Sequence, residues 1–316
     1  MQYRTLGKDG PRISTIGFGA WAMGGSGWSY SWGSQDDEES TRAVHAALDA
    51  GVTFFDTAAV YGLGHSEEVL GRALGPRRKD VVLATKCGLV WDENKRIRRN
   101  GNYASVLQEV EQSLRRLGTD WIDLYQLHWP DTESGSEVEE TMRAMDELVR
   151  SGKVRWVGLS NFDVAGLRRA LGVRHVDSLQ PPYSLLARQV EEAVLPFCQA
   201  NGIGVVAYSP LASGLLSGRY GPDTRFEPGD WRSRSAAHTG EGLRRNLALV
   251  ERLRPIAQAA GRSVAQLAIA WVLAHPAMTA AIVGVRHPGH VRDALPAADW
   301  NLSADERLAI DAALTA

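Results

Sequence analysis

The sequence has little cysteine, no long apolar run and no excess of one charge. Its 316 residues include two cysteines, Cys87 and Cys198, which exclude a disulfide framework and favour reduced thiols in a cytoplasmic protein. No run reaches the roughly 18 apolar residues of a membrane helix, so no membrane span is expected. The formal net charge of −2 supplies no basic face for nucleic acid or acidic lipid. The first ten residues hold no apolar signal core, so no secretory signal is expected.

Two sequence signatures are also missing, one for dinucleotide binding and one for metal binding. The nearest match to a dinucleotide-binding turn, GFGAWAMGG at residues 17–25, lacks a third glycine at the required place, which counts against a doubly wound domain. No cysteine and histidine spacing is typical of a metal site, and none is expected. The chain is otherwise ordinary, and its 44% hydrophobic residues are enough for a sizeable core.

Strand-like and helical segments alternate along the chain. A hairpin is expected around residues 7–11, and Ser66 is expected to cap the helix at 66–75. Eight strands, each followed sooner or later by helix, predict an α/β protein built as one (β/α)8 TIM barrel over residues 1–316, with extra helices that include the apolar 264–276. Residues 213–240 are expected to form a surface loop. The predicted strands are 16–19, 53–56, 81–86, 122–128, 153–160, 176–180, 203–209 and 279–284.

Ionisable side chains fall at the C-terminal ends of three consecutive predicted strands, where such barrels carry their active sites. Asp56, Lys86 and His128 end these strands, and Tyr61 follows Asp56 by five residues. Taken singly, each residue has a structural interpretation. Asp56 can cap a turn, Tyr61 can be a packed aromatic, Lys86 can extend to solvent and His128 can be a structural histidine. Their common placement favours a catalytic site in which Asp56, at the end of an apolar run, faces Lys86.

These four groups permit a specific proton transfer. A tyrosine has a pKa of roughly 10, and a nearby ammonium is expected to lower it. Asp56 is expected to keep Lys86 charged in an apolar mouth, and His128 can hydrogen-bond a substrate oxygen without being ionised. Tyr61 can then protonate an oxygen on which charge develops, such as a carbonyl that receives a hydride.

Several segments together resemble the aldo-keto reductase family. The resemblance covers nearly the whole chain and is carried by GVTFFDTAAVYG at 51–62, VVLATK at 81–86, LYQLHWP at 124–130 and VGLSNF at 157–162. It implies a (β/α)8 barrel and an NAD(P)H-dependent oxidoreductase acting on aldehydes or ketones. It also implies that Asp56, Tyr61, Lys86 and His128 match the catalytic tetrad of that family.

The resemblance further implies the cofactor contacts. NADPH is favoured because Arg286 can meet a 2′-phosphate, although Ala294 stands where the family usually has Asn, and NADH use stays open. A solvated basic loop is the alternative interpretation after the last strand. The implied contacts are Gly19, Ala20, Trp21 and Asp56 near the nicotinamide, Ser160, Asn161 and Gln180 on its carboxamide, Tyr208 stacked on its ring, Ser209, Pro210, Leu211, Gly214, Leu216 and Arg219 along the pyrophosphate, and Gly284, Arg286, His290 and Asp293 at the adenine end.

Aromatic residues after the strands predict where a carbonyl substrate binds. The candidates are Trp21, Tyr61, Trp91, His128 and Trp129, which suit an aldehyde or ketone with an apolar body. Residues 28–32 add two tryptophans and a tyrosine, which are either a further wall or ordinary loop packing. Cys87 follows Lys86 directly, so it is expected on the opposite face of its strand as a structural thiol.

Two other functions remain open. The resemblance extends to the regulatory β-subunits of potassium channels, so a nicotinamide-sensing subunit is an alternative, less favoured because no additional N-terminal segment is read. A glycosidase needs two facing carboxylates, and only Asp56 is suitably placed. Small-molecule carbonyls are the expected partners. The sequence names neither the physiological substrate, the favoured direction nor the oligomeric state.

Overall fold

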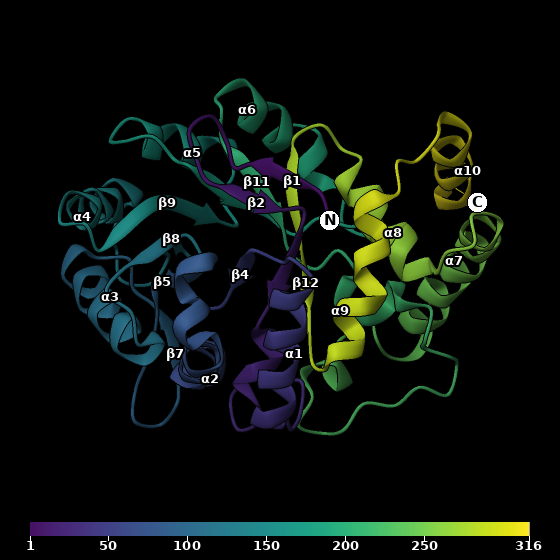
Figure 1. The fold of residues 1–316 in the computed structure, drawn as a ribbon, viewed down its shortest axis with the longest axis horizontal. Coiled ribbons are helices and arrows are strands. Elements are labelled where there is room, and N and C mark those ends of the chain that lie inside the picture. The colour runs from purple at the N-terminus through teal and green to yellow at the C-terminus, as the bar shows by residue number, and fades with distance from the viewer. Residues whose placement is uncertain (316) are drawn as a thin grey trace.

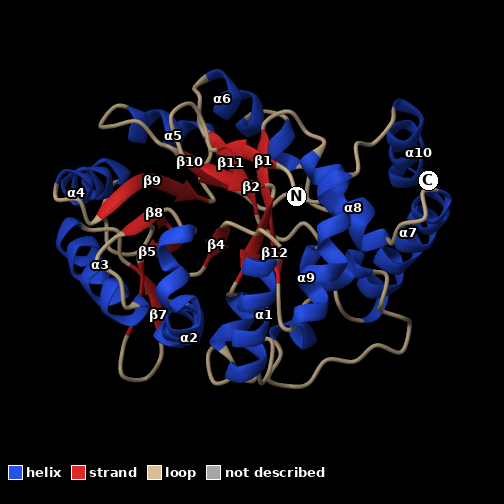
Figure 2. Ribbon diagram, in the orientation of Figure 1, coloured by secondary structure: helices blue, strands red, loops and turns tan. Residues whose placement is uncertain are grey.

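Eight parallel strands close into a barrel that is surrounded by helices (Figure 1). The computed structural model describes residues 1–315. Figure 2 shows the strands at the centre with helices packed around them. Around the barrel the order is β10, β11, β12, β3, β4, β5, β8 and β9. The predicted TIM barrel is therefore confirmed. Its strands are β3 (Ile16–Gly19), β4 (Phe54–Asp56), β5 (Val82–Cys87), β8 (Ile122–Leu127), β9 (Val154–Ser160), β10 (Ser178–Gln180), β11 (Gly204–Ala207) and β12 (Met278–Gly284).

Helices follow the strands and cover the outside of the barrel. Sequence signals set many of their ends: the Asn102 side chain accepts from the Ser105 amide at the start of α3, and Gly118 ends that helix at φ 61°. The helices are α1 (Asp37–Asp49), α2 (His65–Leu74), α3 (Tyr103–Leu117), α4 (Val138–Arg150), α5 (Val164–Leu171), α6 (Val194–Ala200), α7 (Gly240–Ala259), α8 (Val264–Leu273), α9 (Pro288–Ala294) and α10 (Ala304–Thr315).

The predicted N-terminal hairpin closes the bottom of the barrel. Its strands β1 (Tyr3–Thr5) and β2 (Arg12–Ser14) pair antiparallel. The Lys8 amide donates to the Gly202 carbonyl at 2.9 Å, and Leu6 is buried in the same cluster as Phe54 inside the barrel. The hairpin therefore leaves the opposite end, where the strands terminate, as the open mouth.

Two layers of side chains fill the barrel below that mouth. Phe54, Ala84 and Leu124 belong to one fully buried apolar cluster. Because alternate residues of a strand share a face, the next inward position on each of these three strands is two residues later. Those positions hold Asp56, Lys86 and Gln126, all buried. A polar layer thus lies directly on an apolar one, which explains an acidic residue at the end of the FFD run.

The expected extra helix at 264–276 is present as α8, which packs against β12, while α7 and α10 pack together at the right of Figure 1. Other local expectations are wrong. Ser66 does not cap α2, because Gly64 holds the N-cap position and Ser66 lies inside the helix. Residues after the last strand form α9, with Pro288 at its first turn, rather than a solvated loop.

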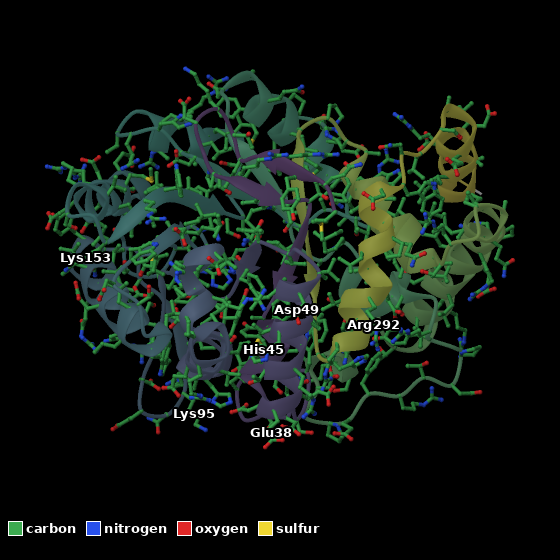
Figure 3. The ribbon with its side chains drawn as sticks, in the orientation of Figure 1. Glu38, His45, Asp49, Lys95, Lys153 and Arg292 are labelled. Carbon is green, nitrogen blue, oxygen red and sulfur yellow. The ribbon has the colours of Figure 1, made fainter. Side chains whose placement is uncertain are left out.

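A second hairpin was not predicted at all. It consists of β6 (Leu89–Trp91) and β7 (Ile97–Arg99), and its loop carries Lys95 at the tip (Figure 3). Gly88, at φ 84°, turns the chain out of the barrel directly after β5. The hairpin therefore stands beside the mouth instead of continuing the barrel wall.

No single helix in the described part of the chain is both long and apolar enough to cross a bilayer. Helices α7 and α8 meet the length and composition test only as a pair that is bent by 86°.

Candidate active site

Asp56, Lys86 and Tyr61 form one buried hydrogen-bonded chain at the mouth of the barrel. The Lys86 Nζ atom donates to Asp56 Oδ1 at 2.7 Å, to the Thr57 carbonyl at 2.8 Å and to the Tyr61 hydroxyl at 3.3 Å. An ammonium has three N–H donors, and these three acceptors use all of them. The Tyr61 oxygen therefore accepts from Lys86, which leaves its own O–H to donate elsewhere.

Amide side chains complete the surroundings of Asp56. Its Oδ2 atom accepts from Gln180 Nε2 at 2.8 Å and from Gln126 Nε2 at 3.3 Å. Gln126 reaches this position because Gly158 opposite it has no side chain, and a Cβ there would lie 2.9 Å from the Gln126 Cγ. With both oxygens bonded, Asp56 is fixed in the orientation that holds Lys86.

Burial dominates the protonation of the site. It raises the pKa of Tyr61 well above 10, with the Asp56 charge acting in the same direction, so the expected lowering by Lys86 is wrong. The positive charge of Lys86 is matched by Asp56 at 2.7 Å, so little of it is left to favour a phenolate. Burial also lowers the pKa of Lys86, and Asp56 opposes that shift. Tyr61 is consequently a neutral O–H donor.

His128 stands beside Tyr61 as a neutral imidazole. The two rings meet edge to face, with centroids 5.7 Å apart. Burial first, and the Lys86 charge second, lower the pKa of His128 well below 6.5. A neutral ring presents one N–H donor, as the sequence predicted, so His128 and the Tyr61 hydroxyl can both hydrogen-bond one oxygen in the mouth.

Buried groups outside the barrel hold the ends of the reactive strands. The Ser66 hydroxyl bonds Thr57 Oγ1 and the Ala20 carbonyl, both at 2.9 Å, and so ties together the loops after β3 and β4. On the outer face of β5, Glu67 accepts from the Thr85 hydroxyl at 2.6 Å, and Glu109 accepts from the Gly88 amide at 3.0 Å. These contacts flank Lys86 on the chain and fix the strand that carries it.

A cavity of about 570 Å³ opens above this layer and runs across the mouth. Its volume falls within the range typical of ligand sites. It brings together most of the predicted residues, while Lys86 lies buried beneath it. The predicted residues that line it are Gly19, Ala20, Trp21, Asp56, Tyr61, His128, Trp129, Ser160, Asn161, Gln180, Tyr208, Ser209, Pro210, Leu211, Gly214, Arg219, Gly284, Arg286, His290 and Asp293.

Two predicted contacts lie outside the lining of the cavity. Trp91 stands on the β6–β7 hairpin, with the Arg116 guanidinium 5.9 Å from its ring centre. The turn at Gly88 carries it away from the mouth. Leu216 has its side chain fully buried in the hydrophobic core. The structure therefore supports neither Trp91 as a substrate contact nor the Leu216 side chain as a cofactor contact.

A fixed set of amides lies on the side of the mouth opposite β4. The Asn161 amide nitrogen donates to the His128 carbonyl at 2.9 Å, and its oxygen accepts from the Tyr208 hydroxyl at 2.8 Å. The Ser160 hydroxyl donates to the Gln180 carbonyl at 2.8 Å. Gln180 uses its amide nitrogen on Asp56, and its side-chain oxygen can accept from a ligand amide. The Tyr208 ring is thereby held at the edge of the cavity.

Backbone strain marks the segment that follows Tyr208. Ser209, Ala212 and Ser213 have left-handed backbone with φ of 54°, 46° and 54°, and Gly214 follows at 96°. Non-glycine residues adopt such angles rarely, and they gather at ligand clamps and active sites. The geometry agrees with a loop shaped to approach a ligand closely.

The end of the cavity far from Tyr61 is rich in arginine, but these arginines already have hydrogen-bond or ion-pair partners within the protein. Arg219 pairs with Asp293. Arg286 donates from Nε to Gln35 Oε1 at 2.9 Å, and its other nitrogens donate to two backbone carbonyls of the same loop. Burial lowers the pKa of His290 to about 4, so this residue adds no positive charge at neutral pH.

Of the aromatic residues at 28–32, Trp32 lines the cavity, whereas Trp28 and Tyr30 lie outside its lining and Tyr30 is exposed. Trp21 stacks on Tyr61 at 5.4 Å between ring centres, and Trp28 and Trp32 lie 6.1 Å and 6.3 Å from Trp21. The indole nitrogen of Trp32 is buried without a protein partner, and its residue lines the cavity. A buried donor of this kind indicates a place for a polar ligand atom.

Sequence reasoning missed a group of lining residues in the predicted surface loop. Asp230 and Arg232 are buried and paired, and the Arg232 guanidinium lies 4.6 Å from the Trp32 ring centre and donates to the Tyr220 hydroxyl at 2.8 Å. Residues 213–240 form the expected surface loop, but its centre contributes the buried Arg232 side chain to the cavity. No periodicity marks these residues, and the contact of Arg232 with Trp32 joins segments that lie far apart along the chain. The missed lining residues with polar side chains are Ser213, Ser217, Tyr220, Arg232, Ser263 and Gln266.

Within residues 1–315, no group of three or more His, Cys, Asp or Glu residues is arranged to hold a metal ion. Cys87 and Cys198 are both buried free thiols.

Comparison with known proteins gives concordant matches. A family model described as "Aldo/keto reductase family" matches residues 15–315. The Aldo-keto reductase YhdN of Bacillus subtilis is 38% identical over 99% of this chain and 94% of its own length. The NADH-specific methylglyoxal reductase of Escherichia coli is 33% identical over 94% of each chain. The structure of the glycerol dehydrogenase AKR11B4 from Gluconobacter oxydans superposes with a TM-score of 0.89, at 36% identity, covering 99% of this chain and 94% of that one.

Proposed function

Because the chain belongs to the aldo/keto reductase family, an oxidoreductase family that acts on carbonyls, we propose that it reduces aldehydes or ketones with NAD(P)H and that Tyr61 is its proton donor. One observation carries the proposal. Lys86 donates its three N–H groups to Asp56, Thr57 and the Tyr61 oxygen. The Tyr61 O–H is therefore free to donate to another acceptor. His128 lies beside that hydroxyl as a second donor.

The residues of the cavity fit a nicotinamide dinucleotide. Ser160, Asn161 and Gln180 offer amide and hydroxyl groups for a carboxamide, and Tyr208 offers a ring face. The strained segment that begins at Ser209 suits close approach to phosphates. When bound, the reduced nicotinamide supplies the hydride for the carbonyl carbon.

The chain itself supplies orientation and the proton. His128 and Tyr61 hydrogen-bond the carbonyl oxygen and so polarise the carbonyl. As negative charge develops on that oxygen, Tyr61 transfers its proton, and the resulting phenolate oxygen keeps the hydrogen bond that it accepts from Lys86. Asp56 keeps Lys86 in place during the transfer. Trp21 stacks on the Tyr61 ring and so holds it in place beside the cavity.

For the cofactor we propose NADPH as preferred, with NADH also used. Arg219, Arg232 and Arg286 line the far end and can attract a 2′-phosphate. The proposal depends chiefly on Arg286, since Arg219 and Arg232 each have an acidic partner. The Escherichia coli relative is described as NADH-specific, so relatives at this level of identity do not decide the preference.

The substrates we propose are small aldehydes or ketones with an apolar body. The entrance beside Tyr61 is bordered by Trp21 and Trp129. The two indole rings offer apolar surface around the Tyr61 hydroxyl. This arrangement favours a substrate whose carbonyl group lies at one end of an apolar body.

The experiment that tests the proposal is a fluorescence titration with NADPH and NADH, followed by a panel of aldehydes and ketones with the preferred cofactor. We expect saturable binding and oxidation of the cofactor that depends on the carbonyl. Absence of binding would refute the dinucleotide site. Tight binding without turnover across a broad panel would instead favour the nicotinamide-sensing subunit.

A further inference from the structure

A second cavity, of about 270 Å³, lies at the opposite end of the molecule from the proposed active site. It is bordered by β1, the C-terminal end of α8, the start of β12, residues 297–302 and Arg307 of α10. Met278 lines this cavity and Gly284 lines the other, so the two open toward the two ends of β12. Their linings come close along α8, where Ile269 faces the first cavity and Ala270 the second.

The second cavity is positively charged. Arg4 and Arg307 line it together with Gln2, His275 and Asn301, and no acidic residue is among the lining. Neither arginine forms an ion pair within residues 1–315. Arg4 is half-buried, and burial alone lowers its pKa, with no carboxylate opposing the shift. An uncompensated half-buried guanidinium is costly, and a bound anion would offset that cost.

Backbone carbonyls hold both guanidinium groups in place. Arg4 Nη1 donates to the carbonyls of Leu273 at 3.0 Å and Met278 at 2.8 Å. Arg307 donates from Nε and Nη2 to the Leu302 carbonyl at 3.2 Å and 3.0 Å. These bonds use both Nη1 hydrogens of Arg4 and leave its Nε and Nη2 donors. The Nη1 donors of Arg307 remain as well. A planar guanidinium whose side chain is already held in place loses little conformational entropy when it binds an oxyanion.

We propose that this cavity binds a small organic oxyanion, a carboxylate- or phosphate-bearing molecule that is held between Arg4 and Arg307. The volume exceeds that of a single oxyanion group, so space remains for a short carbon skeleton beside Trp300 and Gln2. An occupant would join β1, α8, β12 and α10, which lie far apart in the sequence. The site is independent of the carbonyl-reductase proposal, because it shares no lining residue with the active-site cavity.

The test is calorimetric titration of the full chain with potassium phosphate and with sodium malonate, at constant ionic strength and with saturating NADPH in the other cavity. We expect saturable binding of at least one anion, accompanied by a rise in Tm that follows its concentration. The anion that binds more tightly distinguishes the phosphate source from the carboxylate source.

Arginine variants locate the binding. We expect Arg307→Gln to weaken binding about tenfold or more, because it removes one charged fork and retains most of the stem. The matched control is Arg292→Gln, at an exposed arginine on α9 that lines neither cavity (Figure 3), which should bind as the parent does. Arg4→Gln is a second variant and should also weaken anion binding. If Arg4→Gln does not fold, the result for Arg307→Gln alone decides whether the arginines bind the anion. The proposal is overturned if the parent binds neither anion, or if Arg307→Gln binds as tightly as the control.

Discussion

At the scale of single residues, the molecule places charged groups where water is absent and pairs them there. Lys86 and Asp56 are both buried, with Nζ and Oδ1 2.7 Å apart. Removing one partner of such a pair leaves the other charge buried and unpaired. The pair also acts on Tyr61, because the ammonium donates to the Tyr61 oxygen and so fixes the direction of its O–H.

Glu109 is a buried acid that the proposed reaction does not use. Burial raises its pKa from 4.5 to about 8, although the Ser105 and Gly88 hydrogen bonds oppose the shift. The folded protein then binds a proton more tightly than the unfolded chain does. Its free energy of unfolding should consequently fall as pH rises from about 4.5 to about 8, because the stability that the protonated carboxyl contributes is fully present below about 4.5 and is lost across that window.

Replacing Glu109 by Gln should remove this dependence. Gln keeps an acceptor for the Gly88 amide, so the variant should fold. Its Tm relative to the parent should rise progressively between pH 5 and pH 8. Glu68→Gln, at an exposed position of α2, is the control and should follow the parent. Melting curves at several pH values check this, and a constant difference between Glu109→Gln and the parent would contradict the shifted pKa.

At the scale of elements, strands are connected by side chains on the outer face of the barrel as well as by their ladders. Asp123 of β8 accepts from the Leu83 amide of β5 at 3.0 Å and lies 2.7 Å from Arg78 Nη1. It also accepts from Arg155 of β9 at 2.9 Å. One carboxylate thus links three neighbouring strands and neutralises a buried guanidinium.

Asp123→Asn should therefore destabilise the fold strongly. The amide keeps the shape but leaves the Arg78 charge buried without its partner, which costs about 3–5 kcal/mol. Asp49→Asn breaks the exposed pair with Arg77 (Asp49 is labelled in Figure 3), and such pairs contribute about 0–1 kcal/mol. Urea unfolding of both variants measures the difference. Equal losses would show that Asp123 does not link the strands as described.

The element after β12 bears on the choice of cofactor. Arg286→Gln should weaken NADPH binding about tenfold while changing NADH binding less than about twofold, because only NADPH carries the 2′-phosphate. Fluorescence titration of both cofactors measures the two ratios. Equal weakening of both would mean that Arg286 acts through its bonds to Gln35 and the neighbouring carbonyls, not through the phosphate.

Elements with strong periodicity could be predicted from the sequence, and those set by single turns could not. Phe54 and Asp56 on β4, like Ala84 and Lys86 on β5, follow the two-residue repeat of a strand, so their common face was predictable. The β6–β7 hairpin was not, because it lies outside the alternation of strand and helix and Gly88 alone redirects the chain into it. Trp91 was misplaced for the same reason.

Long-range pairing is the other limit. Arg232 joins the cavity because it stacks on Trp32, two hundred residues earlier, and no local pattern records that contact. The protonation of Tyr61 was also misjudged. The sequence suggested that Lys86 lies near it, but not that both would be fully buried with Asp56 already neutralising the ammonium.

At the scale of the whole molecule, one barrel carries two charged cavities at its two ends. The apolar layer of Phe54, Ala84 and Leu124 separates the polar layer at the mouth from the hairpin at the bottom. Reactive groups can therefore be buried at the mouth while most of the stabilising apolar contact lies beneath them and between the strands and helices. Substitutions of uncharged groups in the mouth, such as Tyr61, should accordingly alter chemistry more than folding.

The most direct measurement of the central claim is the turnover of Tyr61→Phe beside its affinity for the preferred cofactor. Phe keeps the ring that packs against Trp21 and removes only the hydroxyl. We predict that kcat falls about 10³-fold, while the Kd for the cofactor stays within about twofold of the parent value. A variant that reduces carbonyls at the parent rate would contradict the account, because the proton would then come from a group other than Tyr61.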